Sequence, residues 1–371
     1  MMNIPPINLK AQFKGLRKEI MTGIRQILDE QRLILGPFCA KLEQQISTYA
    51  GVAHAISCAN GTDALILALM ALDIKAGDEV ITTPYTFFST ASSIAILGGT
   101  PVFVDIDEAT MNIDPTRIEK AITSRTKTIT VVHLFGQVCD MQRIGEIARN
   151  HGLALVEDCA QSLGARKNGV MSGAFGDVAA SSFYPTKNLG GIGEGGVVYT
   201  RRADIGEKVR KLRVHGMGDQ YYHEMIGLNS RLDEIKACAL TVKFPHLESW
   251  NTRRRANAAY YSKQFKKLPL LLPVNATDTT DTSHIFHHYV IRTPKRDELQ
   301  VFLKERGIIC GVYYPLPLHL QPCFSYLGYR EGDFPVAELT AKTSLALPVY
   351  PELKNSERAY VAKCVREFFR S

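Results

Sequence analysis

Hydrophobic positions near the N-terminus repeat with helical spacing. Leu9, Phe13, Leu16, Ile20 and Ile24 recur at intervals of three and four residues, which is the stripe of an amphipathic helix. A second helix is predicted over 38–49, between a Gly-Pro pair and a glycine. The chain is therefore expected to begin with two helices that precede its first strand.

Beyond residue 52, short apolar strands alternate with helices. This rhythm is typical of a parallel sheet with crossover helices, which binds its ligands at the carboxyl ends of the strands. The expected strands are 53–58, 79–83, 102–105, 128–133, 154–157 and 177–183, and the expected helices are 62–72, 86–97, 115–123, 141–151 and 205–214.

The pattern changes in the last third of the chain. Helices are predicted over 232–244 and 247–265, then a loop over 273–281, a strand over 288–292, a helix over 295–306 and a strand over 308–312. This arrangement is too short for a second doubly wound sheet. We therefore expect an α/β protein with a large domain at 1–250 and a smaller C-terminal α/β domain at 251–371, divided within the long helix near Trp250.

Composition narrows the class of protein. The 371 residues are 45% hydrophobic and 22% charged, as in a soluble globular protein. The net charge of +7 is spread along the chain, and its densest run, Arg253-Arg254-Arg255, is interpreted as a solvated helix face. No nucleic-acid partner is therefore expected, whereas an anionic small substrate would suit the charge.

Cysteine usage and hydropathy suggest the location. The eight cysteines are scattered without a C-x-x-C pair, so reduced thiols are expected. No apolar signal core or bilayer-length apolar run is visible, so a cytoplasmic location without membrane contact is the expectation. The adjacent histidines 287 and 288 lack a third ligand at useful spacing, and no metal site is predicted.

Lys187 is the first candidate for chemistry. It follows a predicted strand and a proline turn and precedes a glycine-rich run, where backbone can approach a ligand closely. The alternative is an ordinary surface charge. Asp158 ends another predicted strand and should project toward the same edge of the sheet, although a helix cap or a buried ion pair would also explain it. Gln161 could line the same wall.

Two further features lie at strand ends. Gly61-Thr62-Asp63 opens a predicted helix and could bind an anion through backbone amides and a hydroxyl, while Thr62 could also serve as the N-cap. Phe87 could stack on a planar ring or belong to the core. Lysine, acid, aromatic ring and anion site are together what pyridoxal phosphate requires, because the lysine forms a Schiff base and the acid keeps the pyridine nitrogen protonated.

Five motifs carry a family resemblance that covers nearly the whole chain. They are Asn60-Gly-Thr-Asp-Ala-Leu, Glu157-Asp-Cys-Ala-Gln-Ser, Ser182-Phe-Tyr-Pro-Thr-Lys-Asn-Leu, Gly227-Leu-Asn-Ser-Arg-Leu-Asp-Glu and Tyr313-Tyr-Pro-Leu-Pro-Leu-His. With them the chain resembles the DegT/DnrJ/EryC1/StrS sugar aminotransferases, which have the aspartate aminotransferase (type I) fold. One branch of that family replaces the lysine with histidine and performs dehydration, and this chain keeps the lysine.

The resemblance implies a role for each matching residue. Lys187 would carry the Schiff base, Asp158 would pair with the pyridine nitrogen, Gln161 would meet the ring hydroxyl, and Phe87 would stack on the ring. The phosphate would be held by Thr62, the amide of Asp63 and Ser182. Asn229 would reach the phosphate from a neighbouring subunit, which implies a homodimer. The implied substrate-side residues are Tyr184, Asn188, Arg231, Tyr314 and His319, with His215 as a further candidate.

The implied reaction is a ping-pong transamination from L-glutamate to a keto group of a nucleotide-linked sugar, with Lys187 as the general base. The runs around Arg213 and Gly311 resemble members that act on UDP-linked 3-keto sugars, including 3-keto uronic acids. A 4-keto deoxysugar carried by dTDP or GDP is the alternative acceptor. A lyase or dehydratase of the same fold and a non-enzymatic nucleic-acid-binding regulator are the hypotheses from other classes.

Overall fold

A mixed, mostly parallel sheet forms the centre of the protein. The computed structural model describes residues 2–275 and 277–370, and within them this sheet has seven strands in the order β1-β9-β8-β5-β4-β2-β3. Only β9 runs antiparallel to its neighbours, β8 and β1, so the predicted fold class is confirmed. The strands are β1 (His54–Cys58), β2 (Glu79–Thr82), β3 (Thr100–Phe103), β4 (Thr126–Val132), β5 (Ala154–Asp158), β8 (Val178–Ser182) and β9 (Gly196–Thr200).

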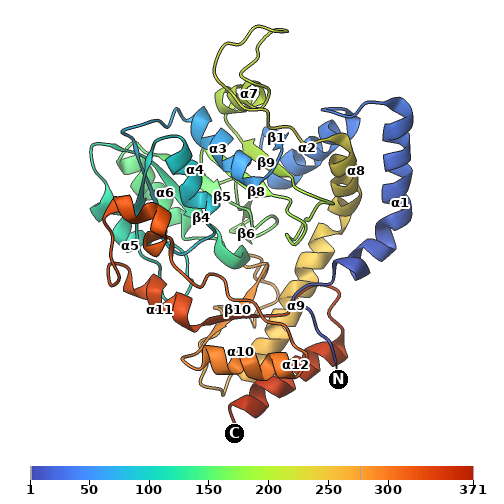
Figure 1. The fold of residues 1–371 in the computed structure, drawn as a ribbon, viewed down its shortest axis with the longest axis vertical. Coiled ribbons are helices and arrows are strands. Elements are labelled where there is room, and N and C mark those ends of the chain that lie inside the picture. The colour runs from blue at the N-terminus through green and yellow to red at the C-terminus, as the bar shows by residue number, and fades with distance from the viewer. Residues whose placement is uncertain (1, 276, 371) are drawn as a thin grey trace.

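Helices cover both faces of the sheet (Figure 1). On β5 and β8, Val156 and Val178 pack against α3, whereas Leu155 and Ala179 pack on the opposite side, as the alternation of side chains along a strand requires. One face carries α3 (Gly61–Ala71), α4 (Ser89–Ile96) and α7 (Ala203–Leu212), and the other carries α2 (Pro37–Ala50), α6 (Met141–Asn150) and α8 (Glu234–Lys243). The first helix, α1 (Leu9–Glu30), packs on α8 through Leu16 and Ile20.

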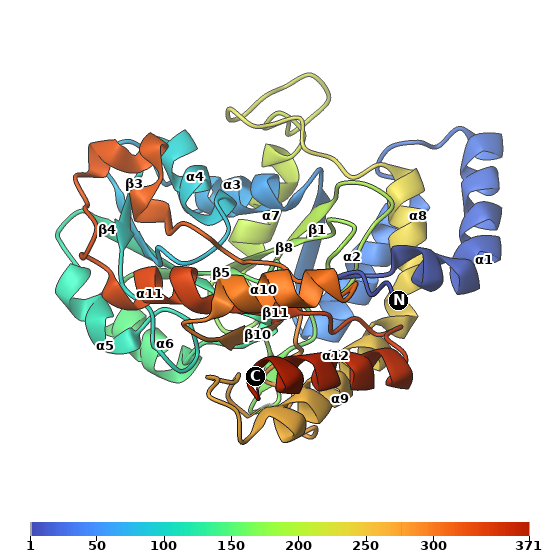
Figure 2. The same ribbon diagram turned by 60° about the horizontal axis from the view of Figure 1, so that its bottom comes forward.

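A second, two-stranded sheet lies below the first in Figure 1. In it β10 (Tyr289–Arg292) pairs antiparallel with β11 (Ser344–Leu347). Its apolar residues share a core with α9 (Leu247–Phe265), α10 (Arg296–Glu305) and α12 (Asn355–Phe368), which Figure 2 shows from below. Helix α11 (Pro335–Thr343) precedes β11. The proposed division at residues 250 and 251 stays a prediction.

Several boundaries differ from the expectation. The predicted strand at 308–312 is wrong, because Ile308 and Gly311 form only isolated bridges, with Ile4 and Ala346. The helix expected over 115–123 is only α5 (Pro115–Ile118) with a 3-10 turn after it. The structure adds β9, β11, α11, α12 and the hairpin β6 (Arg166–Lys167) with β7 (Val170–Met171), which were not predicted. The described part of 273–281 contains no helix or strand.

The basic run on α9 is not a solvated face. Arg253 is exposed, but Arg254 and Arg255 are only 3% and 6% exposed. The helix extends from α8 to α12 in Figure 1, and Arg254 on it donates to the carbonyls of Phe286 and His287. Arg255 lies within 3.4 Å of the Glu248 carboxylate. Among the described residues, no helix combines the length and the apolar composition that a membrane span requires.

Candidate active site

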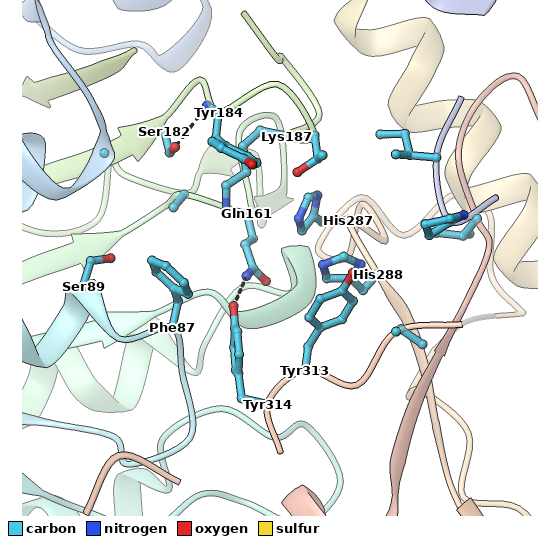
Figure 3. Close-up of a pocket in the computed structure, with 18 of the residues that line it drawn as sticks. Phe87, Ser89, Gln161, Ser182, Tyr184, Lys187, His287, His288, Tyr313 and Tyr314 are labelled. Carbon is cyan, nitrogen blue, oxygen red and sulfur yellow. Dashed lines mark hydrogen bonds between the residues drawn. The ribbon is translucent and has the colours of Figure 1, made fainter. Parts of the chain in front are cut away.

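A cavity of about 710 Å³ opens at the carboxyl ends of the parallel strands. Segments that are distant in the sequence meet there, from Pro6 and Ile7 near the N-terminus to β11 and Val349. Figure 3 shows Lys187 near its middle, with Ser182 and Phe87 on one side and His287 and His288 on the other. The cavity brings together eight of the predicted site residues, which are Gly61, Thr62, Phe87, Gln161, Ser182, Tyr184, Lys187 and Tyr314.

Lys187 lies on the loop between β8 and β9. Its amide donates to the Tyr184 carbonyl at 2.8 Å, which closes a tight turn. Glycine is required at 190, since a Cβ there would lie 2.1 Å from the Pro185 carbonyl oxygen. Burial lowers the pKa of Lys187 from 10.5 to about 8, although the Asp158 carboxylate opposes this shift. Because Lys187 is only partly exposed and lines the cavity, the interpretation of it as an ordinary surface charge is wrong.

Asp158 ends β5 and is 4% exposed. Its Oδ2 accepts a hydrogen bond from Thr90 Oγ1 at 2.8 Å, and its Oδ1 accepts one from the Ala160 amide at 3.1 Å. Burial raises the pKa of Asp158, while these hydrogen bonds and Lys187 oppose the rise. Asp158 itself does not line the cavity, but Ala160 and Gln161 directly after it do.

Glu157 anchors the end of β5 from the opposite face. Its carboxylate accepts hydrogen bonds from the amides of Gly173, Phe175 and Gly176 and from His133 Nε2. His133 Nδ1 accepts from the Cys139 amide, so the ring proton is on Nε2. His133, Glu157 and Cys159 are the one group of possible metal ligands found in the described residues, and these hydrogen bonds already engage the histidine and the carboxylate. The absence of a metal site stays a prediction.

The predicted anion site, which we call the anion corner, lies where α3 begins beside β8. Gly61 allows the close approach, since a Cβ there would lie 2.6 Å from Ser182 Cβ. The N-cap of α3 is Asn60 and not Thr62, because Asn60 Oδ1 accepts from the Asp63 amide at 2.8 Å. That cap leaves the hydroxyls of Thr62 and Ser182 on the cavity wall.

Aromatic and amide groups line the facing wall. Phe87 is 54% exposed, so the core interpretation of this residue is wrong. Its ring lies 6.0 Å from that of Tyr314. Gln161 Oε1 accepts from the Phe135 amide at 2.7 Å, and its Nε2 donates to Tyr314 Oη at 3.1 Å, as drawn in Figure 3. The two bonds fix the orientation of the Gln161 amide.

The remaining predicted residues do not line the cavity of this single chain. Asn188 is buried and hydrogen-bonded to Asn251 and His287. His319 is buried, with Nε2 3.0 Å from Glu338 Oε1, so in this chain its contact is with Glu338 and not with the cavity. Asp63, Arg231, His215 and Asn229 also lie outside the lining, the last two exposed at the surface. Their substrate or cofactor contacts stay predictions.

Other residues of the lining were not predicted from the sequence, and four of them carry polar or aromatic groups of interest. They are His287 and His288, which directly precede β10, Tyr313 beside them in Figure 3, and Arg254, which is hydrogen-bonded to the 286–287 backbone. The rings of His288 and Tyr313 stack at 4.1 Å. Burial lowers the pKa of both histidines well below 6.5, so both are neutral at neutral pH. The only signal in the sequence was the adjacent histidine pair beside a predicted strand, which was weighed only as a metal site.

Comparison with known families decides the assignment. The sequence profile of the DegT/DnrJ/EryC1/StrS aminotransferase family matches residues 14–366. The chain belongs to this family. The aminotransferase assignment and the predicted resemblance are thereby confirmed.

Curated members of the DegT/DnrJ/EryC1/StrS family match the chain over nearly its full length. The pleiotropic regulatory protein of Geobacillus stearothermophilus is 50% identical and covers 100% of this chain and 99% of its own. The UDP-N-acetyl-3-dehydro-alpha-D-glucosamine 3-aminotransferase of Acidithiobacillus ferrooxidans is 44% identical, with 98% and 97% covered. The dTDP-3-amino-3,4,6-trideoxy-alpha-D-glucose transaminase of Streptomyces venezuelae is 42% identical, with 98% and 96% covered.

Solved structures of similar aminotransferases share the fold. DesV of S. venezuelae, in complex with a ketimine intermediate, superposes with a TM-score of 0.97 at 41% identity, and both chains are covered at 100%. NtdA of Bacillus subtilis, with bound cofactor PMP, superposes with a TM-score of 0.92 at 28% identity and covers 100% of this chain and 86% of its own.

Proposed function

We propose that this protein transfers an amino group from L-glutamate to the keto carbon of a UDP-linked 3-keto sugar. It is a nucleotide-sugar aminotransferase of the DegT/DnrJ/EryC1/StrS family, and its cofactor is pyridoxal 5'-phosphate. The observation that carries the proposal is Lys187, whose pKa is lowered to about 8 beside Asp158, in a cavity of about 710 Å³.

The residues of the cavity suit this cofactor. Gly61 keeps the start of α3 close to Ser182, which leaves hydroxyls and backbone for a phosphate group. The exposed ring of Phe87 offers a flat apolar surface, and Asp158 offers a buried negative charge. When bound, pyridoxal phosphate supplies an electron sink that stabilises negative charge on the substrate carbon. Thr62, Ser182, Phe87, Gln161 and Asp158 would hold it.

The chain's own groups would then move the proton and exclude water. Lys187 Nζ, with its lowered pKa, can take a proton from the substrate carbon and return it near neutral pH. The Asp158 carboxylate would favour a proton on a facing nitrogen, because a buried negative charge attracts it. Tyr313 and Tyr314 cover the wall opposite Lys187 and limit access of water.

The family members support a nucleotide-linked acceptor with a keto group at C3. The Acidithiobacillus relative is named for a UDP-linked 3-dehydro sugar, and the Streptomyces relative for a dTDP-linked 3-amino sugar. A relative of Pseudomonas aeruginosa, 38% identical over 94% of this chain, is named for a UDP-linked 3-oxo glucuronate. For the carrier nucleotide we propose UDP, and dTDP is the second candidate.

A second subunit would complete the site. Asn229 is exposed in the single chain and forms a bridge with Val214 beneath the loop that protrudes at the top of Figure 1. Tyr221, Tyr222 and Ile226 on that loop are 83%, 68% and 91% exposed. Large apolar side chains exposed together favour a protein contact, here a second copy of the chain.

The direct test is a panel of 3-keto and 4-keto sugars carried by UDP or dTDP. With L-glutamate present, we expect the 3-amino UDP-sugar and one equivalent of 2-oxoglutarate, measured by mass spectrometry. A larger kcat/KM for a 4-keto deoxysugar or for dTDP would reject the finer proposal. Failure to form 2-oxoglutarate with any acceptor would favour a lyase, and salt-sensitive DNA binding without bound cofactor would favour a regulator.

The lowered pKa of Lys187 predicts how the rate of cofactor attachment to the apoprotein depends on pH. A protonated amine cannot attack an aldehyde, so attachment should be slow below pH 8, accelerate through about 8 and then level off. Stopped-flow absorbance with excess pyridoxal phosphate measures this rate. Because the Asp158 carboxylate raises the pKa of Lys187, Asp158→Asn should move the midpoint to lower pH. A midpoint near 10.5, the ordinary value for lysine, would contradict the prediction.

A further inference from the structure

Arg254 occupies the cavity wall with its charge unpaired. It is 3% exposed and lines the cavity from α9. Its Nη1 donates to the carbonyl oxygens of Phe286 and His287 at 3.4 and 3.1 Å, and its Nε is buried without a partner. None of the carboxylates in the described residues lies within ion-pair distance of it. A buried cation is costly without a counter-ion, so this site is suited to an anion from outside the chain.

Burial does not remove this charge. It lowers the pKa of Arg254 only to about 10, so the guanidinium stays protonated at neutral pH, and Glu352 opposes the shift without forming an ion pair. The neighbouring imidazoles carry no charge of their own because burial holds the pKa of His287 and His288 well below 6.5. The end of the cavity nearest the second sheet therefore has one fixed positive charge.

The position of Arg254 separates it from the anion corner. Its two hydrogen bonds tie it to the 286–287 backbone, and Figure 3 shows His287 and Ser182 on opposite sides of Lys187. A single guanidinium balances the charge of one carboxylate, and its fork matches the two carboxylate oxygens. The neutral His287 and His288 can add further hydrogen bonds without further charge.

We propose that Arg254 is the carboxylate-binding residue of the substrate site. This inference rests on the proposed function and names the group that the second end of the cavity recognises. Two substrates of the proposed reaction can bring a carboxylate there: the amino donor, and a sugar that is itself a uronic acid. Both enter the same cavity in turn, because the two half-reactions use the same lysine.

The test compares Arg254→Met and Arg254→Lys with Arg253→Met, which removes an exposed arginine from the same helix. In single turnovers of the holoenzyme, Arg254→Met should raise the dissociation constant for L-glutamate by about 10- to 100-fold. Arg254→Lys should lie between this variant and the wild type, because lysine keeps the charge but loses the fork. The aminated enzyme should still react with a 3-keto sugar nucleotide that has no carboxylate.

The outcomes separate the two sources of the carboxylate. A loss confined to L-glutamate supports the donor, and a loss confined to a 3-keto uronate sugar nucleotide supports the sugar. The proposal would be overturned if Arg254→Met lost as much affinity for the neutral sugar nucleotide as for the carboxylate substrates. It would also be overturned if Arg254→Met lost no more affinity than Arg253→Met. If the wild type fails to react with L-glutamate, the proposed function fails. In that case the carboxylate site would be tested by measuring, with calorimetry, the affinity of the wild-type and Arg254→Lys holoenzymes for succinate. Equal affinities of the two proteins would reject Arg254 as the carboxylate-binding residue.

Discussion

Lys187→Ala abolishes covalent attachment of the cofactor and lowers turnover by about 10⁴-fold or more. The substitution removes both the nucleophile and the base whose pKa is lowered to about 8. Borohydride trapping followed by mass spectrometry should find the labelled peptide in the wild type and not in the variant. The melting temperature should change little, because the Lys187 side chain faces a cavity and makes no hydrogen bond that the fold requires.

Lys243 provides the matched control. Burial also lowers the pKa of Lys243 to about 8, but its Nζ donates to the Gly190 carbonyl at 2.6 Å and it does not line the cavity. Lys243→Met should therefore lose stability while the cofactor stays attached to Lys187. If Lys187→Ala retained wild-type turnover, or if the label appeared on Lys243, the assignment of the nucleophile would be rejected.

Asp158→Asn should lower kcat by about 10²- to 10³-fold with the fold intact. The amide preserves the shape of the side chain but removes the buried negative charge, whose preorganised field is what favours a protonated ring nitrogen. Single-turnover absorbance after mixing the holoenzyme with L-glutamate measures this loss in the first half-reaction. The acceptor sugar is not needed for this measurement.

Thr90→Val separates the charge of Asp158 from its orientation. It removes the donor of the 2.8 Å hydrogen bond to Asp158 Oδ2 and keeps the carboxylate. Loss of one such bond is worth about tenfold, so the Thr90 variant should be far more active than Asp158→Asn. If kcat fell by a similar factor in both variants, the orientation of the Asp158 side chain, and not its charge, would be what Asp158 contributes.

The sequence identified those parts of the site that lie at the ends of regular strands. Asp158 and Lys187 each follow a short apolar segment, and parallel strands bring their carboxyl ends to one edge. Lys187, Phe87 and Gln161, which the sequence predicts at such strand ends, line one cavity. Roles taken from the family resemblance remain predictions until the variants are measured.

The missed features depend on contacts between distant parts of the chain. Arg254 is buried because α9 lies against the 286–287 backbone, and a helical pattern by itself does not reveal this contact. His287 and His288 reach the cavity from the segment before β10, whose location depends on how the second sheet packs. β9 begins with Gly196 inside a glycine-rich run, which favours a loop by local propensity.

The pairing of β9 with β8 should keep the loop that carries Lys187 ordered in the apoprotein. β9 pairs antiparallel with β8, and the Phe183 amide donates to the Gly195 carbonyl at 2.8 Å, so the segment carrying Lys187 is fastened at both ends. Inside this loop the Lys187 amide donates to the Tyr184 carbonyl and the Gly191 amide donates to the Phe183 carbonyl, so the loop has less conformational entropy left to lose. The apoprotein should therefore protect the amides of Phe183, Lys187 and Gly191 from hydrogen exchange almost as well as the holoenzyme, and it should capture the cofactor without an ordering step.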